Sequence, residues 1–166
     1  MSSTLAASAH TVPPRKFIAW LPTVAWVAMI ACFSTDSFSS AHTGSILLRL
    51  IHSIYGPITE RQFDVIHVFI RKGAHFTVYG VLSWLAYNSW RATFPSPRPW
   101  QFNWSGLALA LTLVAASADE FHQSFVPSRT SSPLDVLLDV TGAIFFQTLI
   151  ASFAKGYSTR RGRSAH

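Results

Sequence analysis

The sequence predicts an all-α fold, a four-helix transmembrane bundle with a short amphipathic surface helix between the first and second spans. Charged residues make up only 12% of the 166 residues, against about 25% in soluble globular proteins. Hydrophobic residues make up 49% and aromatic residues 14%. Four segments of helical character are each long enough to cross a bilayer core of about 30 Å.

The first predicted span covers about 16–34. Arg15 and Lys16 precede a long apolar run. A signal peptide starts in the same way, but no convincing small-residue cleavage site follows here, so we interpret the run as a spanning helix. Pro22 is expected to kink this helix lightly. Residues 1–15 are small and polar, and we expect them to be disordered.

The second predicted span is preceded by two helical signals. Ser45–Tyr55 carries apolar residues on one face and polar residues on the other, which predicts a short helix on the membrane surface, with a lid over a site as the alternative. Thr59-Glu60-Arg61-Gln62 matches a capping box and should start a helix that runs to about Trp90. Such a helix exceeds the bilayer core, so the span itself is placed at about 65–90.

The third and fourth predicted spans cover about 105–125 and 133–154. A polar turn separates them. Ser132 is expected to be the N-cap of the fourth span, with Pro133 at its first helical position. The sequence therefore predicts a polar link between two apolar helices.

Four spans place both termini on one side of the membrane. The basic residues gather on that side: Arg15, Lys16, Arg91, Arg98, Lys155, Arg160, Arg161 and Arg163. The positive-inside rule makes it the cytoplasmic side. The transmembrane domain then covers 16–155, and 156–166 form a basic cytoplasmic tail. Four of the thirteen basic residues lie at this end of the chain. They could form a nucleic-acid arm, but beside a spanning helix we interpret them as an anchor near anionic lipid, so no nucleic-acid partner is expected.

Polar residues recur at helical spacing at the outer ends of the predicted spans. The candidate ligand-binding set is Arg71, Lys72, His75, Tyr79, Asp119, Glu120, Gln123, Arg129, Asp135 and Asp139. Charge at membrane depth is costly and indicates function by default. Positions three and four apart share a helix face, so we expect these stripes to meet in an outward-facing polar pocket. Its arginine and lysine side chains are suited to phosphate or carboxylate.

A structural interpretation remains open for the same residues. Asp135 can stabilise the N-terminus of its helix, and Arg71 and Lys72 can extend to the membrane surface. Asp119 or Asp139 can neutralise a cation inside the bundle. The protein would then be a scaffold whose charges only hold the helices together.

Enzyme motifs are incomplete in this chain. Ser128-Arg129 followed by Asp135 and Asp139 has the spacing of a membrane acid phosphatase segment, but aspartate stands where the nucleophilic histidine belongs. No His-x3-His or His-Glu-x2-His spacing is present, so neither a metal site nor a cofactor is predicted. The enzyme alternative that remains is an acid–base pair, with His75 or His122 beside Asp119, acting on an envelope lipid or peptide.

Two segments resemble the signatures of the VanZ-like family, small membrane proteins named for a teicoplanin-resistance component. The first is Arg71-Lys72-x-Ala74-His75-Phe76-x-x-Tyr79-Gly80-x-Leu82. The second is Asp119-Glu120-x-His122-Gln123-x-Phe125-Val126-Pro127-x-Arg129-x-x-Ser132-x-x-Asp135-x-x-x-Asp139-x-x-Gly142. Phe33-Ser34 also fits, and the similarity spans about 17–154. The family usually has asparagine near Asp139 and glycine near Ser128, so Asp139 adds a carboxylate.

The resemblance implies a multi-pass protein of the bacterial inner membrane, linked to tolerance of glycopeptide antibiotics that target cell-wall precursors. Together with the charge and depth of the pocket, it leads us to expect an anionic envelope ligand. This ligand would be a lipid headgroup or a lipid-linked wall precursor, with membrane lipids as the general partners. The oligomeric state is not predicted.

Overall fold

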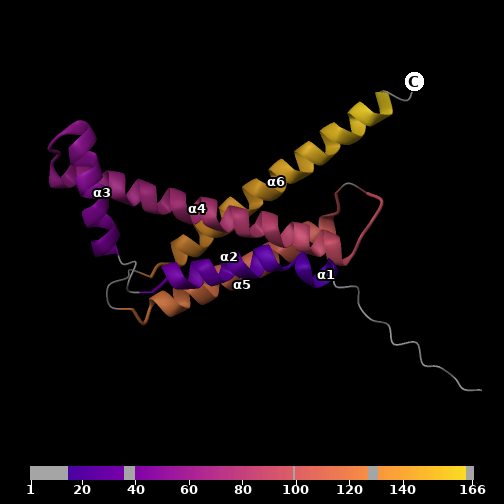
Figure 1. Ribbon diagram of the computed structural model, residues 1–166, viewed down its shortest axis with the longest axis horizontal. Coiled ribbons are helices and arrows are strands. Elements are labelled where there is room, and N and C mark those ends of the chain that lie inside the picture. The colour runs from indigo at the N-terminus through magenta and orange to yellow at the C-terminus, as the bar shows by residue number, and fades with distance from the viewer. Residues whose placement is uncertain (1–14, 36–39, 99, 127–130, 164–166) are drawn as a thin grey trace, which may run out of the picture.

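A computed structural model of the chain describes residues 15–35, 40–98, 100–126 and 131–163. The described residues form six helices and no strand, which confirms the all-α prediction (Figure 1). The helices are α1 Arg15–Ile18, α2 Leu21–Phe33, α3 Ser40–Tyr55, α4 Glu60–Thr93, α5 Phe102–Gln123 and α6 Pro133–Arg163. The predicted disorder of 1–15 falls almost entirely outside the described residues.

The first predicted helix is interrupted. α1 ends at Ile18, and α2 begins at Leu21, just before Pro22. Proline has no N–H to donate to the carbonyl four residues earlier, and its ring clashes with that carbonyl. The N–H of Trp20 instead bonds to the carbonyl of Phe17 at 3.0 Å. The interruption is thus larger than the light kink that we expected.

The helix between the predicted spans and the long helix after it form as predicted. α3 starts at Ser40, earlier than the expected Ser45, and ends at Tyr55. The capping box of α4 is complete, since Thr59 Oγ1 accepts from the backbone N–H of Gln62 and the Gln62 side chain accepts from the backbone N–H of Thr59. Two otherwise unbonded N–H groups are satisfied in this way.

The last helix is longer than predicted. α6 starts at Pro133, and the N–H of Leu134 lies 3.3 Å from Ser132 Oγ, so Ser132 caps the helix as expected. The helix continues to Arg163, so the predicted tail from 156 extends α6 rather than forming a separate segment.

α4 and α6 cross at the centre of the molecule and run in the same direction (Figure 1). Hydrogen bonds join Arg71 to Asp135, His75 to Asp139, and Ser83 to Gln147, and each pair is 64 residues apart. A constant offset requires two parallel helices in register. α5 packs against both, and α2 packs against α4 and α5.

Hydrogen bonds from α2 also cross the core. Thr23 Oγ1 lies 2.9 Å from Ser89 Oγ. Trp26 Nε1 donates to the carbonyl of Val78 at 3.0 Å. Because later residues of α2 meet earlier residues of α4, these two helices are antiparallel. The helices therefore alternate in direction in the order α2, α4, α5, α6.

Two segments of the described chain are long and apolar enough to cross a membrane, Lys16–Phe33 and Pro133–Gly156. α4 and α5 lie where the second and third spans were predicted, but they do not meet the same criterion of length and hydropathy. Large apolar side chains are exposed along both of them, as a lipid-facing surface requires. Membrane character is thus supported, and the four-span arrangement stays a prediction.

Candidate functional site

Two cations of α4 share one carboxylate of α6. Arg71 Nη2 lies 3.1 Å from Asp135 Oδ2, and Lys72 Nζ lies 2.9 Å from Asp135 Oδ1. The Asp135 side chain is only 5% exposed, whereas that of Lys72 is 50% exposed. The carboxylate is thus enclosed, while one of its two partners faces outward. A crevice of about 240 Å³ lies here, lined by these three residues with Val68 and Ser132.

One helical turn further along, His75 meets Asp139. Its Nδ1 lies 3.1 Å from Asp139 Oδ1, and the Asp139 side chain is fully buried. The second oxygen, Asp139 Oδ2, is also buried and has no hydrogen-bond partner among the described residues. The contact holds the imidazole ring and leaves its other nitrogen, Nε2, available for a second interaction.

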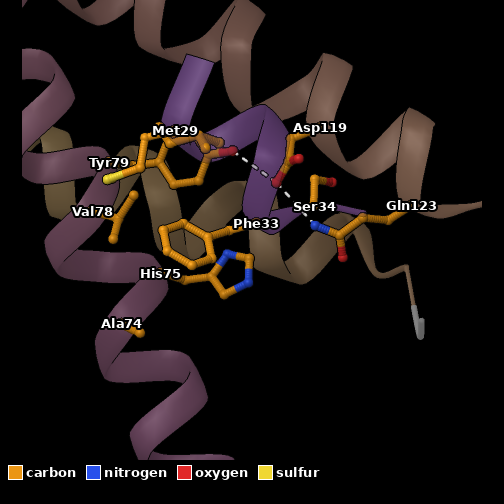
Figure 2. A pocket seen from close by; sticks show the side chains of 10 residues that line it. Met29, Phe33, Ser34, Ala74, His75, Val78, Tyr79, Asp119 and Gln123 are labelled. Atoms are coloured by element: carbon orange, nitrogen blue, oxygen red, sulfur yellow. Dashed lines mark hydrogen bonds between the residues drawn. The ribbon is translucent and has the colours of Figure 1, made fainter. Parts of the chain in front are cut away.

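The third contact joins α4 to α5. Tyr79 donates from its hydroxyl to Asp119 Oδ2 at 2.9 Å, and Gln123 Nε2 donates to the same oxygen at 2.9 Å (Figure 2). Tyr79 is almost fully buried. The Asp119 carboxylate is therefore held by two neutral donors, whereas Asp135 is held by two cations.

Glu120 ties the end of α5 to the start of α6. Its Oε2 accepts from the backbone N–H of Ser132 at 2.8 Å, and its backbone carbonyl accepts from Ser131 Oγ at 3.0 Å. The residue is 5% exposed, yet its other oxygen, Oε1, is buried without a hydrogen-bond partner in the part of the chain that the structure describes. Glu120 thus combines a structural role with one unused acceptor.

His122 lies apart from the other histidine of the candidate set. Its Nδ1 is 3.4 Å from the Oγ of Ser34, the C-cap residue of α2, and His122 itself is exposed. His122 and Asp119 both line a pocket of about 260 Å³ on the α2 side of α5. Arg129 lies outside the described residues.

A second pocket of about 260 Å³ opens between α2, α4 and α5 (Figure 2). Its polar lining consists of Ser34, His75, Tyr79, Asp119 and Gln123. The remainder of its wall is mainly apolar, and Figure 2 shows Phe33 beside the ring of His75 and Met29 beside that of Tyr79. The site therefore consists of hydrogen-bonded polar side chains with a pocket beside them.

Comparison with known proteins adds one finding. The family model described as VanZ/LLP1 matches residues 18–154. The chain belongs to the VanZ/LLP1 family. No curated protein and no solved structure matches it.

In this VanZ/LLP1 chain, α2 supplies part of the site, which the polar stripes did not predict. Ser34 is buried, and it lies in both 260 Å³ pockets. The only sequence signal for it was the fit of Phe33-Ser34 to the family pattern. Spacing within one helix could not detect it, because a single small polar residue at a helix end has no periodicity.

Sequence motifs also missed a grouping across helices. His75 of α4, Glu120 of α5 and Asp135 of α6 each offer one atom to a set whose members lie within 4.8 Å of one another. Metal-binding motifs describe residues that are near in sequence. No such motif can find three ligands that only packing brings together.

Proposed function

We propose that this VanZ/LLP1 protein is an inner-membrane protein that binds the phosphate of an anionic envelope ligand in the crevice beside Asp135. The observation that carries the proposal is the sharing of one carboxylate by Arg71 and Lys72. Both side chains line the crevice and reach solvent, with exposed fractions of 27% for Arg71 and 50% for Lys72. Guanidinium and ammonium groups together suit a phosphate, which accepts several hydrogen bonds.

The surroundings of the crevice favour a lipid ligand. Val68 lines the crevice and is 50% exposed, and the neighbouring Phe69 is 74% exposed. An acyl or polyprenyl chain can lie against such apolar side chains while its phosphate contacts Lys72. A phospholipid and a lipid-linked wall precursor share this chemistry.

We expect four spans, with both termini in the cytoplasm and the crevice toward the outer leaflet. The alternation of direction from α2 to α6 supports this topology, since α1 and the end of α6 lie toward one end of the molecule and the start of α6 lies toward the other (Figure 1). A reporter fused after Lys155 should be active only in the cytoplasm. Activity of that fusion outside the cytoplasmic membrane would contradict the topology.

Lipid binding can be measured on the purified full-length chain by native mass spectrometry. The double variant Arg71→Ala/Lys72→Ala should retain an added anionic lipid at least about tenfold less than the wild type, because hydrogen bonds between charged groups contribute about 1.5–3 kcal/mol each. Arg61→Ala is the matched control, since Arg61 is an exposed cation on the same helix.

Two probes distinguish the sources of the phosphate. Phosphatidylglycerol tests a phospholipid headgroup, and a polyprenyl-diphosphate-linked wall precursor tests the other class. Equal retention of both probes by the double variant and the wild type would overturn the proposal. A preference for the precursor would support a role in glycopeptide tolerance, and teicoplanin tolerance of cells should then fall with the double variant.

The His75–Asp139 contact favours a second candidate, an enzyme that modifies an envelope lipid or peptide. A buried carboxylate that orients an imidazole is the arrangement of many general bases. The structure pairs His75 with Asp139 rather than with the expected Asp119. Loss of all turnover in His75→Gln, with only weakened binding in Lys72→Ala, would identify catalysis.

A further inference from the structure

Three helices bring possible metal ligands to one point. One atom each from His75, Glu120 and Asp135 lies within 4.8 Å of the others. Ligand atoms bound at about 2.0–2.2 Å to one ion are separated by no more than roughly 4.4 Å. A small side-chain adjustment would therefore allow all three residues to contact a single divalent ion.

The second observation is the pair of buried carboxylate oxygens without partners. Glu120 Oε1 belongs to a residue that is 5% exposed, and Asp139 Oδ2 to one that is fully buried. An unsatisfied buried acceptor costs about 1–3 kcal/mol, and more when it is charged. Each of these two carboxylate oxygens can accept from a further donor or bind a cation.

The orientation of His75 is the third observation. Asp139 Oδ1 contacts Nδ1 of the ring at 3.1 Å. When Nδ1 carries the proton and donates it to this carboxylate, Nε2 presents its lone pair. Metal-binding histidines are held by carboxylates in this way, and the contact also raises the basicity of the ligand.

Charge balance points in the same direction. Among the described residues of the site, the carboxylates are Asp119, Glu120, Asp135 and Asp139, and the permanent cations are Arg71 and Lys72. With a neutral His75, four carboxylates then stand against two permanent cations among the described residues of the site. A divalent ion among the carboxylates would lower the cost of keeping them together inside the bundle.

We propose that the imidazole of His75 and the carboxylates of Glu120 and Asp135 bind one divalent transition-metal ion, Zn²⁺ or Mn²⁺, with Asp139 as a positioning residue. One imidazole with two carboxylates suits these ions better than Mg²⁺ or Ca²⁺, which prefer oxygen alone. Each oxygen of Asp135 has a second lone pair, so contact with the ion is compatible with its bonds to Arg71 and Lys72. The site does not depend on the binding of a lipid.

Calorimetric titration of the full-length, tag-free, chelator-treated protein in detergent tests this proposal. We expect one Zn²⁺ or Mn²⁺ per chain and much weaker binding of Mg²⁺. His75→Gln and Glu120→Gln should weaken binding by more than tenfold, and Asp139→Asn by about 10–100-fold, the usual effect of losing an outer-shell partner. The controls are Asp64→Asn and His52→Gln, which alter an exposed carboxylate and an exposed imidazole.

Three results would overturn the proposal. The first is that the wild type binds neither Zn²⁺ nor Mn²⁺, and the second is that both His75→Gln and Glu120→Gln bind as the wild type does. The third is an X-ray absorption spectrum of the Zn²⁺-loaded wild type that shows no imidazole, whereas we expect one imidazole among nitrogen and oxygen ligands. This spectrum decides the question if the two variants fail to fold. Lys72→Ala should keep the metal while losing lipid, which separates this site from the lipid crevice.

Discussion

Replacement of Gly142 with alanine should destabilise the bundle by about 3 kcal/mol or more, the upper range for overpacking a close contact. An added Cβ would lie well inside 3.0 Å of the Phe76 carbonyl oxygen, and 2.9 Å from its carbonyl carbon. These are backbone atoms of α4, so no side-chain rotation can relieve the clash. α4 and α6 would have to separate, and the contacts of Arg71 and His75 with α6 would weaken.

Thermal unfolding in detergent measures this effect, and other glycines of the chain provide controls. Gly106 of α5 has no atom within 4 Å of an added Cβ, so Gly106→Ala should stabilise its helix by about 0.5–1 kcal/mol. At Gly80 an added Cβ would meet the ring of Phe146, and Phe146→Ala should rescue Gly80→Ala. If Gly142→Ala were as stable as Gly106→Ala, the close crossing of α4 and α6 would be wrong.

Periodicity was sufficient to predict that the polar stripes face one another. Residues four apart lie on one side of a helix, so Arg71, His75 and Tyr79 had to share a face, and their contacts with α5 and α6 confirm it. The choice of partners could not be predicted in this way. It depends on how far one helix is shifted along the other, which the close contact of Gly142 with Phe76 limits.

α5 shows why spacing alone misplaces some residues. It lies between three other helices, so adjacent residues on it reach different neighbours. Asp119 contacts Tyr79 of α4, Glu120 contacts the start of α6, and His122 contacts Ser34 of α2. A stripe at i and i+3 was expected to mark one surface, but a helix with neighbours on several sides divides such a stripe between them.

Removing His75 alone should destabilise the protein more than removing His75 and Asp139 together. His75→Leu leaves the Asp139 carboxylate buried beside apolar atoms, and breaking a buried pair in this way costs about 3–5 kcal/mol. His75→Leu/Asp139→Leu removes both polar groups and should unfold within about 1 kcal/mol of the wild type, because apolar replacement of a whole buried pair is often neutral. Thermal unfolding of the two single variants and the double variant measures the coupling.

The same variants separate a structural role of the pair from a functional one. A double variant that regains stability but no longer binds Zn²⁺ would show that the pair is kept for the site, since the bundle does not need it. A double variant that regains stability and binds Zn²⁺ as the wild type does would show that His75 and Asp139 only join α4 to α6. Exposed His52→Leu should change stability by less than about 0.5 kcal/mol, which controls for the loss of an imidazole. The comparison thus decides between the scaffold and the site with variants that remain folded.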